Sequence, residues 1–70
     1  MATSLAVHAW TTEHELAWID SRERSVSELE AIRRAVVYRE YAPPCNKRLV
    51  LQALDWRIRL KRRAERAVRA

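Results

Sequence analysis

Apolar side chains recur at the spacing of an amphipathic helix in the middle of the chain. Between residues 26 and 41 they follow one another every three or four positions, which places them on one face of a helix. The stripe consists of Val26, Leu29, Ile32 and Val36, and it is widened by Val37 and Tyr41. The pattern predicts a helix that packs this face against the rest of the molecule.

Two capping-box patterns precede or begin that stripe. Thr12 stands three residues before Glu15, and Ser25 stands three residues before Glu28. In this pattern each side chain satisfies a free backbone donor near the other, so we expect helix starts after Thr12 and after Ser25. No Gly or Pro lies between residues 12 and 41, so this part is either two helices or one bent helix.

The first of these segments has a short apolar face. Leu16 and Ile19 are the expected buried pair. Trp18 lies opposite them on the helix, so we expect it to face a partner or a second copy of the chain.

Pro43 and Pro44 end the first helical part, because Pro disfavours helix in the residue before it and cannot continue the hydrogen-bond ladder. The expected organisation is a flexible N-terminus over 1–11, helix over 12–41, a turn over 42–46 and a final helix over 47–70. That helix starts either with Pro44 in its first turn or with Asn46 as N-cap.

The final helix is apolar around much of its first half and basic on the rest. Its apolar positions cover more than half of the circumference: Leu49, Val50, Leu51, Ala53, Leu54, Trp56, Ile58 and Leu60. We therefore expect this half to be buried on more than one side. Arginines fill the remaining arc and the C-terminal turns: Arg48, Arg59, Arg62, Arg63, Arg66 and Arg69. The pattern predicts a half-buried rod with a projecting cationic end.

Composition points to a single all-α domain. The chain has 70 residues, enough for one small core, and it contains no Gly, the residue most used in hairpin turns. We predict a small domain of two or three helices with a long basic C-terminal helix. No apolar run is long enough to cross a bilayer and no signal-peptide pattern is present, which predicts a cytoplasmic protein.

Charge is divided unevenly along the chain. Residues 1–42 hold five Arg and seven acidic residues, a net charge of −2, while residues 43–70 hold nine Arg or Lys and two acidic residues, a net charge of +7. A basic end suits a polyanion, and Arg suits bidentate contacts to phosphate. We predict a small non-enzymatic protein that contacts nucleic acid through the Arg-rich helix. Base reading as a helix-turn-helix is disfavoured, since the apolar first half of the long helix offers few polar side chains to a groove.

An acidic protein surface is the alternative partner. Trp and Arg are enriched among interface hot spots, so Trp18 and Trp56 are the expected anchors, although Trp56 is also interpretable as a core residue with its indole edge near water. In this case the chain would be a small regulatory or inhibitory protein, of the kind that phages and other mobile elements encode. We expect a homo-oligomer. A membrane is the least favoured partner, because residues 61–70 offer Ala and one Val where insertion needs larger apolar side chains.

The sequence predicts no catalysis, metal or cofactor. His8 and His14 are six residues apart and do not share a helical face, so both are expected at the surface. Cys45 lies near basic residues and a helix start, which would lower its thiol pKa, but no base accompanies it. Glu13 and Glu15 are assigned to the helix cap rather than to a catalytic pair.

Two arginines, Arg33 and Arg57, fall within otherwise apolar stripes. A buried Arg without a partner is strongly destabilising. We therefore predict that one or both pair with acids of the first two segments, such as Glu30 or Glu40, and fix how the final helix docks.

Overall fold

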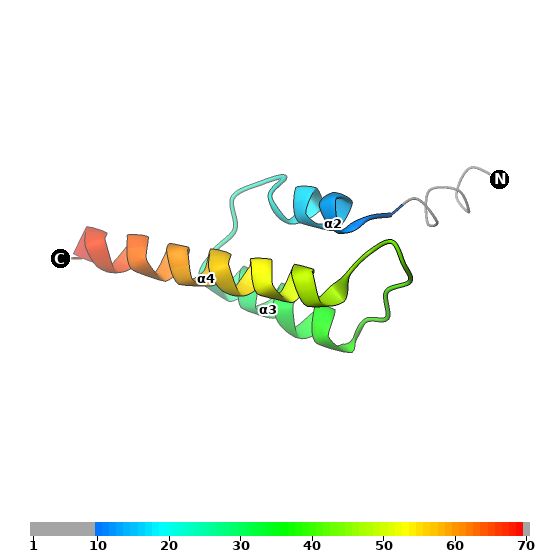
Figure 1. Ribbon diagram of the computed structural model, residues 1–70. Helices are drawn as coiled ribbons and strands as arrows, with labels where there is room; N and C mark the ends of the chain where they lie inside the picture. Colours follow the sequence, from blue (N-terminus) through cyan, green and yellow to red (C-terminus); the bar gives the residue numbers. More distant parts are fainter. Residues whose placement is uncertain (1–9, 70) are drawn as a thin grey trace.

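Three helices make up the part of the chain that the computed structural model describes, residues 10–69. They are α2 (Thr12–Ile19), α3 (Val26–Tyr38) and α4 (Lys47–Arg69), and Figure 1 shows their arrangement. The all-α prediction is confirmed, and residues 12–41 hold two helices rather than one. Of the N-terminal segment predicted over residues 1–11, only Trp10 and Thr11 fall within the described residues.

Helix α2 is capped one residue earlier than its sequence predicts. Thr11, not Thr12, is the N-cap: its Oγ1 accepts from His14 N at 3.2 Å, and His14 Nδ1 accepts from Thr11 N at 3.0 Å. Thr12 Oγ1 instead accepts from Asn46 N at 2.8 Å, just before α4 begins. The tertiary contact therefore decides between two adjacent threonines that local sequence makes nearly equivalent.

The break between α2 and α3 is made by polar side chains. Arg24 donates from Nε to Ile19 O at 2.8 Å, a carbonyl that the end of α2 leaves free, and from Nη2 at 3.2 Å to Trp18 O, which also accepts from Ser21. Ser25 then caps α3 in the predicted capping box with Glu28. A second helix start follows directly, so no Gly or Pro is needed.

Helix α3 ends at Tyr38, three residues before the predicted end at Tyr41. Backbone beyond it is extended, so that Tyr41 can donate from its hydroxyl to Glu15 Oε1 in α2 at 3.0 Å. Lys47 Nζ donates to Val37 O at 2.5 Å and satisfies a carbonyl in the last turn of α3. The end of α3 is therefore set by contacts to two other helices.

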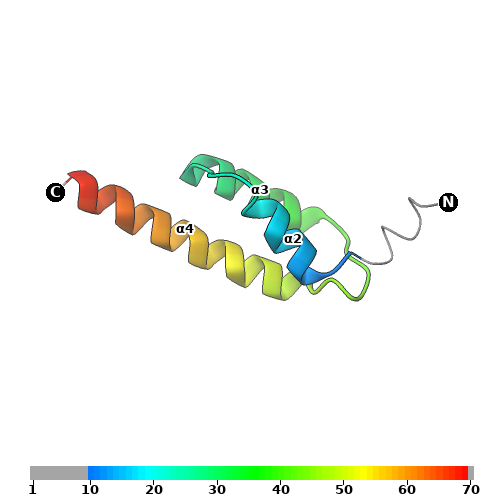
Figure 2. The same cartoon turned by 90° about the horizontal axis from the view of Figure 1, so that it is seen from above.

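Helix α4 starts after Asn46, whose Oδ1 accepts from Leu49 N at 3.3 Å, so the second of the two alternative starts is the one observed. It is unbroken to Arg69, a length of about 35 Å at 1.5 Å per residue. Figures 1 and 2 show that its C-terminal turns extend past the N-terminal end of α3. The continuous projecting rod predicted from sequence is confirmed.

The core lies where α2 and α3 both pack on one side of α4 (Figure 2). Helix α4 contributes Val50, Leu54 and Ile58, which recur every four residues and form a single buried face. The complete buried cluster is Ile19, Leu29, Val36, Cys45, Val50, Leu54 and Ile58. The prediction that the first half of α4 is buried on more than one side is wrong for this chain, because its two neighbouring helices cover only one side.

Candidate nucleic-acid interface

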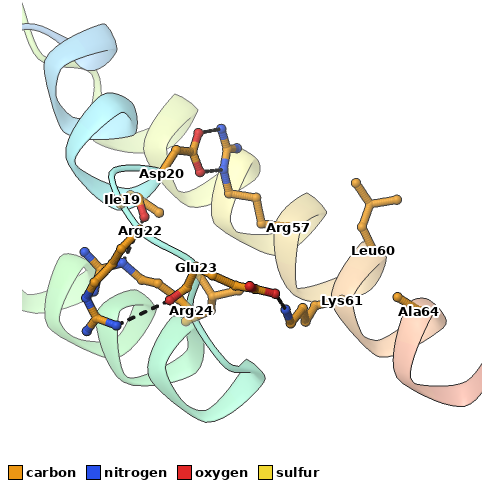
Figure 3. A pocket seen from close by; sticks show the side chains of 10 residues that line it. Ile19, Asp20, Arg22, Glu23, Arg24, Arg57, Leu60, Lys61 and Ala64 are labelled. Atoms are coloured by element: carbon orange, nitrogen blue, oxygen red, sulfur yellow. Dashed lines mark hydrogen bonds and ion pairs between the residues drawn. The ribbon is translucent and has the colours of Figure 1, made fainter. Parts of the chain in front are cut away.

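Ion pairs flank the buried face of α4 on the side of the α2–α3 connection, and Figure 3 shows the open pocket that they line. Arg57 makes a bidentate contact with Asp20, with Nη2 at 2.6 Å from Oδ2 and Nε at 2.8 Å from Oδ1. One turn later Lys61 Nζ lies 2.7 Å from Glu23 Oε1. Hydrogen bonds from these cations hold the pKa of both carboxyls below their ordinary values. Two cations of α4 are therefore used to dock the helix.

A second line of ion pairs joins the opposite flank of α4 to α3. Arg33 Nε lies 2.5 Å from Asp55 Oδ1, and Arg62 pairs with Glu30. The predicted pairing with an acid of the first two segments is confirmed for Arg57, whose partner is Asp20. Arg33 pairs instead with Asp55 of α4 itself, and neither arginine pairs with Glu30 or Glu40. Both arginines are half-buried, since carboxylates at the edge of the core hold their charged ends near solvent.

Five of the six arginines predicted as the binding site are exposed and have no carboxylate partner among residues 10–69. We call these five the Arg row: Arg48, Arg59, Arg63, Arg66 and Arg69. At 100° per residue the first four fall within an arc of about 60°. Arg62 differs because Glu30 already pairs with it. The structure therefore leaves most of the predicted site unpaired, whereas Arg62 is paired with α3.

An exposed apolar band runs beside the Arg row. Leu49, Trp56 and Leu60 are 49%, 53% and 43% exposed, and half-buried Ala53 completes the band at spacings of four, three and four residues. Trp56 is not a core residue. Sequence reasoning placed all four in a buried surface, because a helical wheel cannot tell how many neighbours a helix has. Their 4-3-4 spacing places them on a different face from Val50, Leu54 and Ile58, and this was the one sequence feature that could have indicated a second apolar surface.

The other two described tryptophans have partners within the chain. Trp18 is 44% exposed, as its position opposite Leu16 and Ile19 predicted, and the guanidinium of Arg24 lies 4.7 Å from its ring centroid. Trp10 stacks on His14 and donates from Nε1 to Glu15 Oε2 at 2.8 Å. His14 is exposed, and His8 lies outside the described residues.

Sequence reasoning missed a buried polar cluster around Glu15. This carboxylate is 3% exposed and accepts from Trp10, Tyr41 and Arg39, so it joins α2 to the turn before α4 instead of capping α2. Cys45 is buried nearby, and burial, followed by the charge of Glu15, raises the pKa of its thiol. The predicted lowering of that pKa is wrong, because the side chain faces the core rather than the basic helix start.

Neither a metal site nor a membrane span is found in the described part of the chain. Residues 10–69 contain no cluster of three potential metal-ligating His, Cys, Asp or Glu side chains. No helix within the same range combines the length and apolar character needed to span a bilayer.

Comparison with protein-family models finds no match, and searches of curated proteins and of solved structures find none either.

Proposed function

We propose that this chain is a non-enzymatic binding protein that contacts nucleic acid through the Arg row of α4. The single observation that carries the proposal is which cations of α4 are paired with carboxylates and which are not. The cations that flank the buried face are paired with carboxylates, whereas the Arg row is exposed and unpaired among residues 10–69. A row of guanidinium groups can neutralise several phosphates and release their counterions.

The arrangement within the Arg row also favours an anionic ligand. Arg59 and Arg63 are four residues apart and Arg63 and Arg66 three apart, so like charges are neighbours on the helix surface. Such pairs destabilise a helix by about 0.2–0.5 kcal/mol each. A polyanion that lies along the row would remove this repulsion.

Salt dependence of binding tests the proposal. Fluorescence anisotropy with a labelled oligonucleotide should show affinity that falls steeply as NaCl rises. Five phosphate contacts predict a slope of log K against log [salt] between about −3.5 and about −4.5. Binding that is absent at low salt, or that ignores salt, would contradict the proposal.

Matched charge reversals distinguish the contribution of the Arg row to binding from the contribution of the net charge of the protein. Arg63→Glu and Arg34→Glu change the net charge equally, and Arg34 is an exposed residue of α3 without an ion pair in the described structure. Arg63→Glu should weaken binding well beyond Arg34→Glu, and the triple reversal of Arg59, Arg63 and Arg66 should abolish it. Equal weakening by the two single variants would show that only net charge matters.

A second candidate function is docking on an acidic protein as a regulator or inhibitor. It is favoured by the exposed apolar band, since Trp56 with flanking arginines is the composition of an interface hot spot. Such binding should persist at moderate salt and fail when Trp56 is truncated. Trp18→Ala would report whether the second predicted anchor takes part.

A further inference from the structure

The apolar band and the Arg row lie side by side on α4, and a ligand of the row must also meet the band. Trp56 is three residues before Arg59 and seven before Arg63, so the indole lies on the same side of the helix, about 4.5 Å and about 10.5 Å along its axis from them. Any molecule that follows the row over these turns passes the exposed indole.

Trp56 is the most exposed of the three described tryptophans. Trp10 stacks on His14 and Trp18 is covered by Arg24, but no aromatic or cationic group of residues 10–69 lies over Trp56. At 53% exposure its indole is available to a flat ligand group. This observation is independent of the charges that carry the proposed function.

Duplex and single-stranded nucleic acids meet such a surface differently. A duplex offers phosphates to the Arg row, but its bases are stacked on one another and leave the indole and the two exposed leucines uncovered. A single strand offers phosphates and unpaired bases together. Its bases stack on aromatic side chains whatever their sequence.

We propose that the ligand is single-stranded nucleic acid whose phosphates bind the Arg row and whose bases stack on Trp56. This inference rests on the proposed function and adds the ligand class. The band of a second copy is the competing occupant. An antiparallel pairing of two bands would bring two Arg rows to the same flank of the interface, and the described part of α4 has no free carboxylate beside the band to offset them.

The test compares a labelled oligo(dT) with the matched dT·dA duplex by anisotropy. Wild-type protein should bind oligo(dT) more tightly than the duplex, with quenching of tryptophan fluorescence. Trp56→Leu should weaken oligo(dT) binding about tenfold and remove most of the quenching, because loss of one stacked base costs that order of affinity. Duplex binding should change little, and Trp56→Phe should lie between.

Trp18→Leu is the matched control, since Trp18 is exposed to a similar degree but lies on α2. It should leave oligo(dT) binding unchanged, with circular dichroism to verify that each variant is helical. Duplex binding as tight as oligo(dT) binding, or equal effects of Trp56→Leu and Trp18→Leu, overturns the stacking proposal while the proposed function survives. If the wild-type protein binds neither oligo(dT) nor the duplex, both the stacking proposal and the proposed function are overturned.

Sedimentation velocity tests whether a second copy of the chain, rather than nucleic acid, covers the apolar band. The stacking proposal expects a protein whose Trp56 remains available without nucleic acid, so Leu60→Glu should leave the sedimentation coefficient unchanged. A dimer that Leu60→Glu dissociates, together with unchanged oligo(dT) affinity in Trp56→Leu, would assign the band to self-association and overturn the proposal.

Discussion

The two sides of α4 contain similar residues in opposite states. On the inner side Leu54 is fully buried and Arg57 is held by Asp20, whereas on the outer side Leu60 and Arg59 are exposed and Arg59 has no ion pair within residues 10–69. The inner residues stabilise the fold, and the outer residues are free to contact a ligand. The difference shows that residue type alone does not decide which side chains of this helix are buried or paired; the position of the neighbouring helices does.

The largest expected difference between the two sides is in apolar packing. Leu54→Ala removes a fully buried side chain and should cost about 2–5 kcal/mol of unfolding free energy, a large share for a domain of this size. Leu60→Ala on the outer side should change it by about 0.5 kcal/mol or less. Urea unfolding followed by circular dichroism measures both. Similar losses would mean that the outer side is packed in solution.

Glu15 extends the comparison to the buried polar cluster. Glu15→Ala leaves the donors of Trp10 and Tyr41 without their acceptor, so we expect a loss of about 1–3 kcal/mol. Glu13→Ala, in the same helix but exposed, is the control. If both variants unfold at the same urea concentration, the cluster does not hold α2 in place.

The arginines of the two sides should differ by a smaller amount. Arg57→Leu breaks a half-buried bidentate pair and should cost about 1 kcal/mol after allowance for solvent screening. Arg59→Leu should cost nothing measurable. A double-mutant cycle of Arg57→Leu with Asp20→Asn isolates the coupling. Zero coupling would refute the docking role of this pair.

Acid should weaken the inner side selectively. The pKa values of Asp20 and Glu23 are lowered by hydrogen bonds from Arg57 and Lys61 of α4 respectively. A lowered folded-state pKa gives stability that is present above the unfolded value and is lost as pH falls through the folded one, here below about pH 4. Thermal melts across that range should show the loss, and Asp20→Asn should make it shallower. A melting temperature independent of acid would contradict this linkage.

The smallest expected change in unfolding free energy is on the outer side of α4, where a substitution should stabilise the protein rather than destabilise it. Arg63→Gln removes like-charge neighbours and should stabilise α4 by a few tenths of a kcal/mol, or about 2 °C in Tm at low salt. Added NaCl should raise the wild-type Tm by a similar amount and reduce the benefit of the variant. A destabilised Arg63→Gln would show that the Arg row has a structural partner.

Local features of the fold were predictable because their causes are local. The Ser25–Glu28 capping box, the Asn46 cap and the unbroken final helix depend on side chains within a few residues of each other. The predicted N-cap of α2 was wrong for the complementary reason: Thr12 accepts a hydrogen bond from the backbone of Asn46, which is distant in sequence. The early end of α3 has the same kind of cause.

The sequence by itself determined a helical chain whose long final helix carries a continuous line of arginines, since helical period and residue order are sufficient for both. Only the tertiary structure decided which of those charges remain available. The carboxylates that pair with Arg57, Lys61 and Arg62 are 37, 38 and 32 positions away along the chain. It also decided that Trp56 is exposed, because burial of one face of a helix depends on how many other helices pack against it.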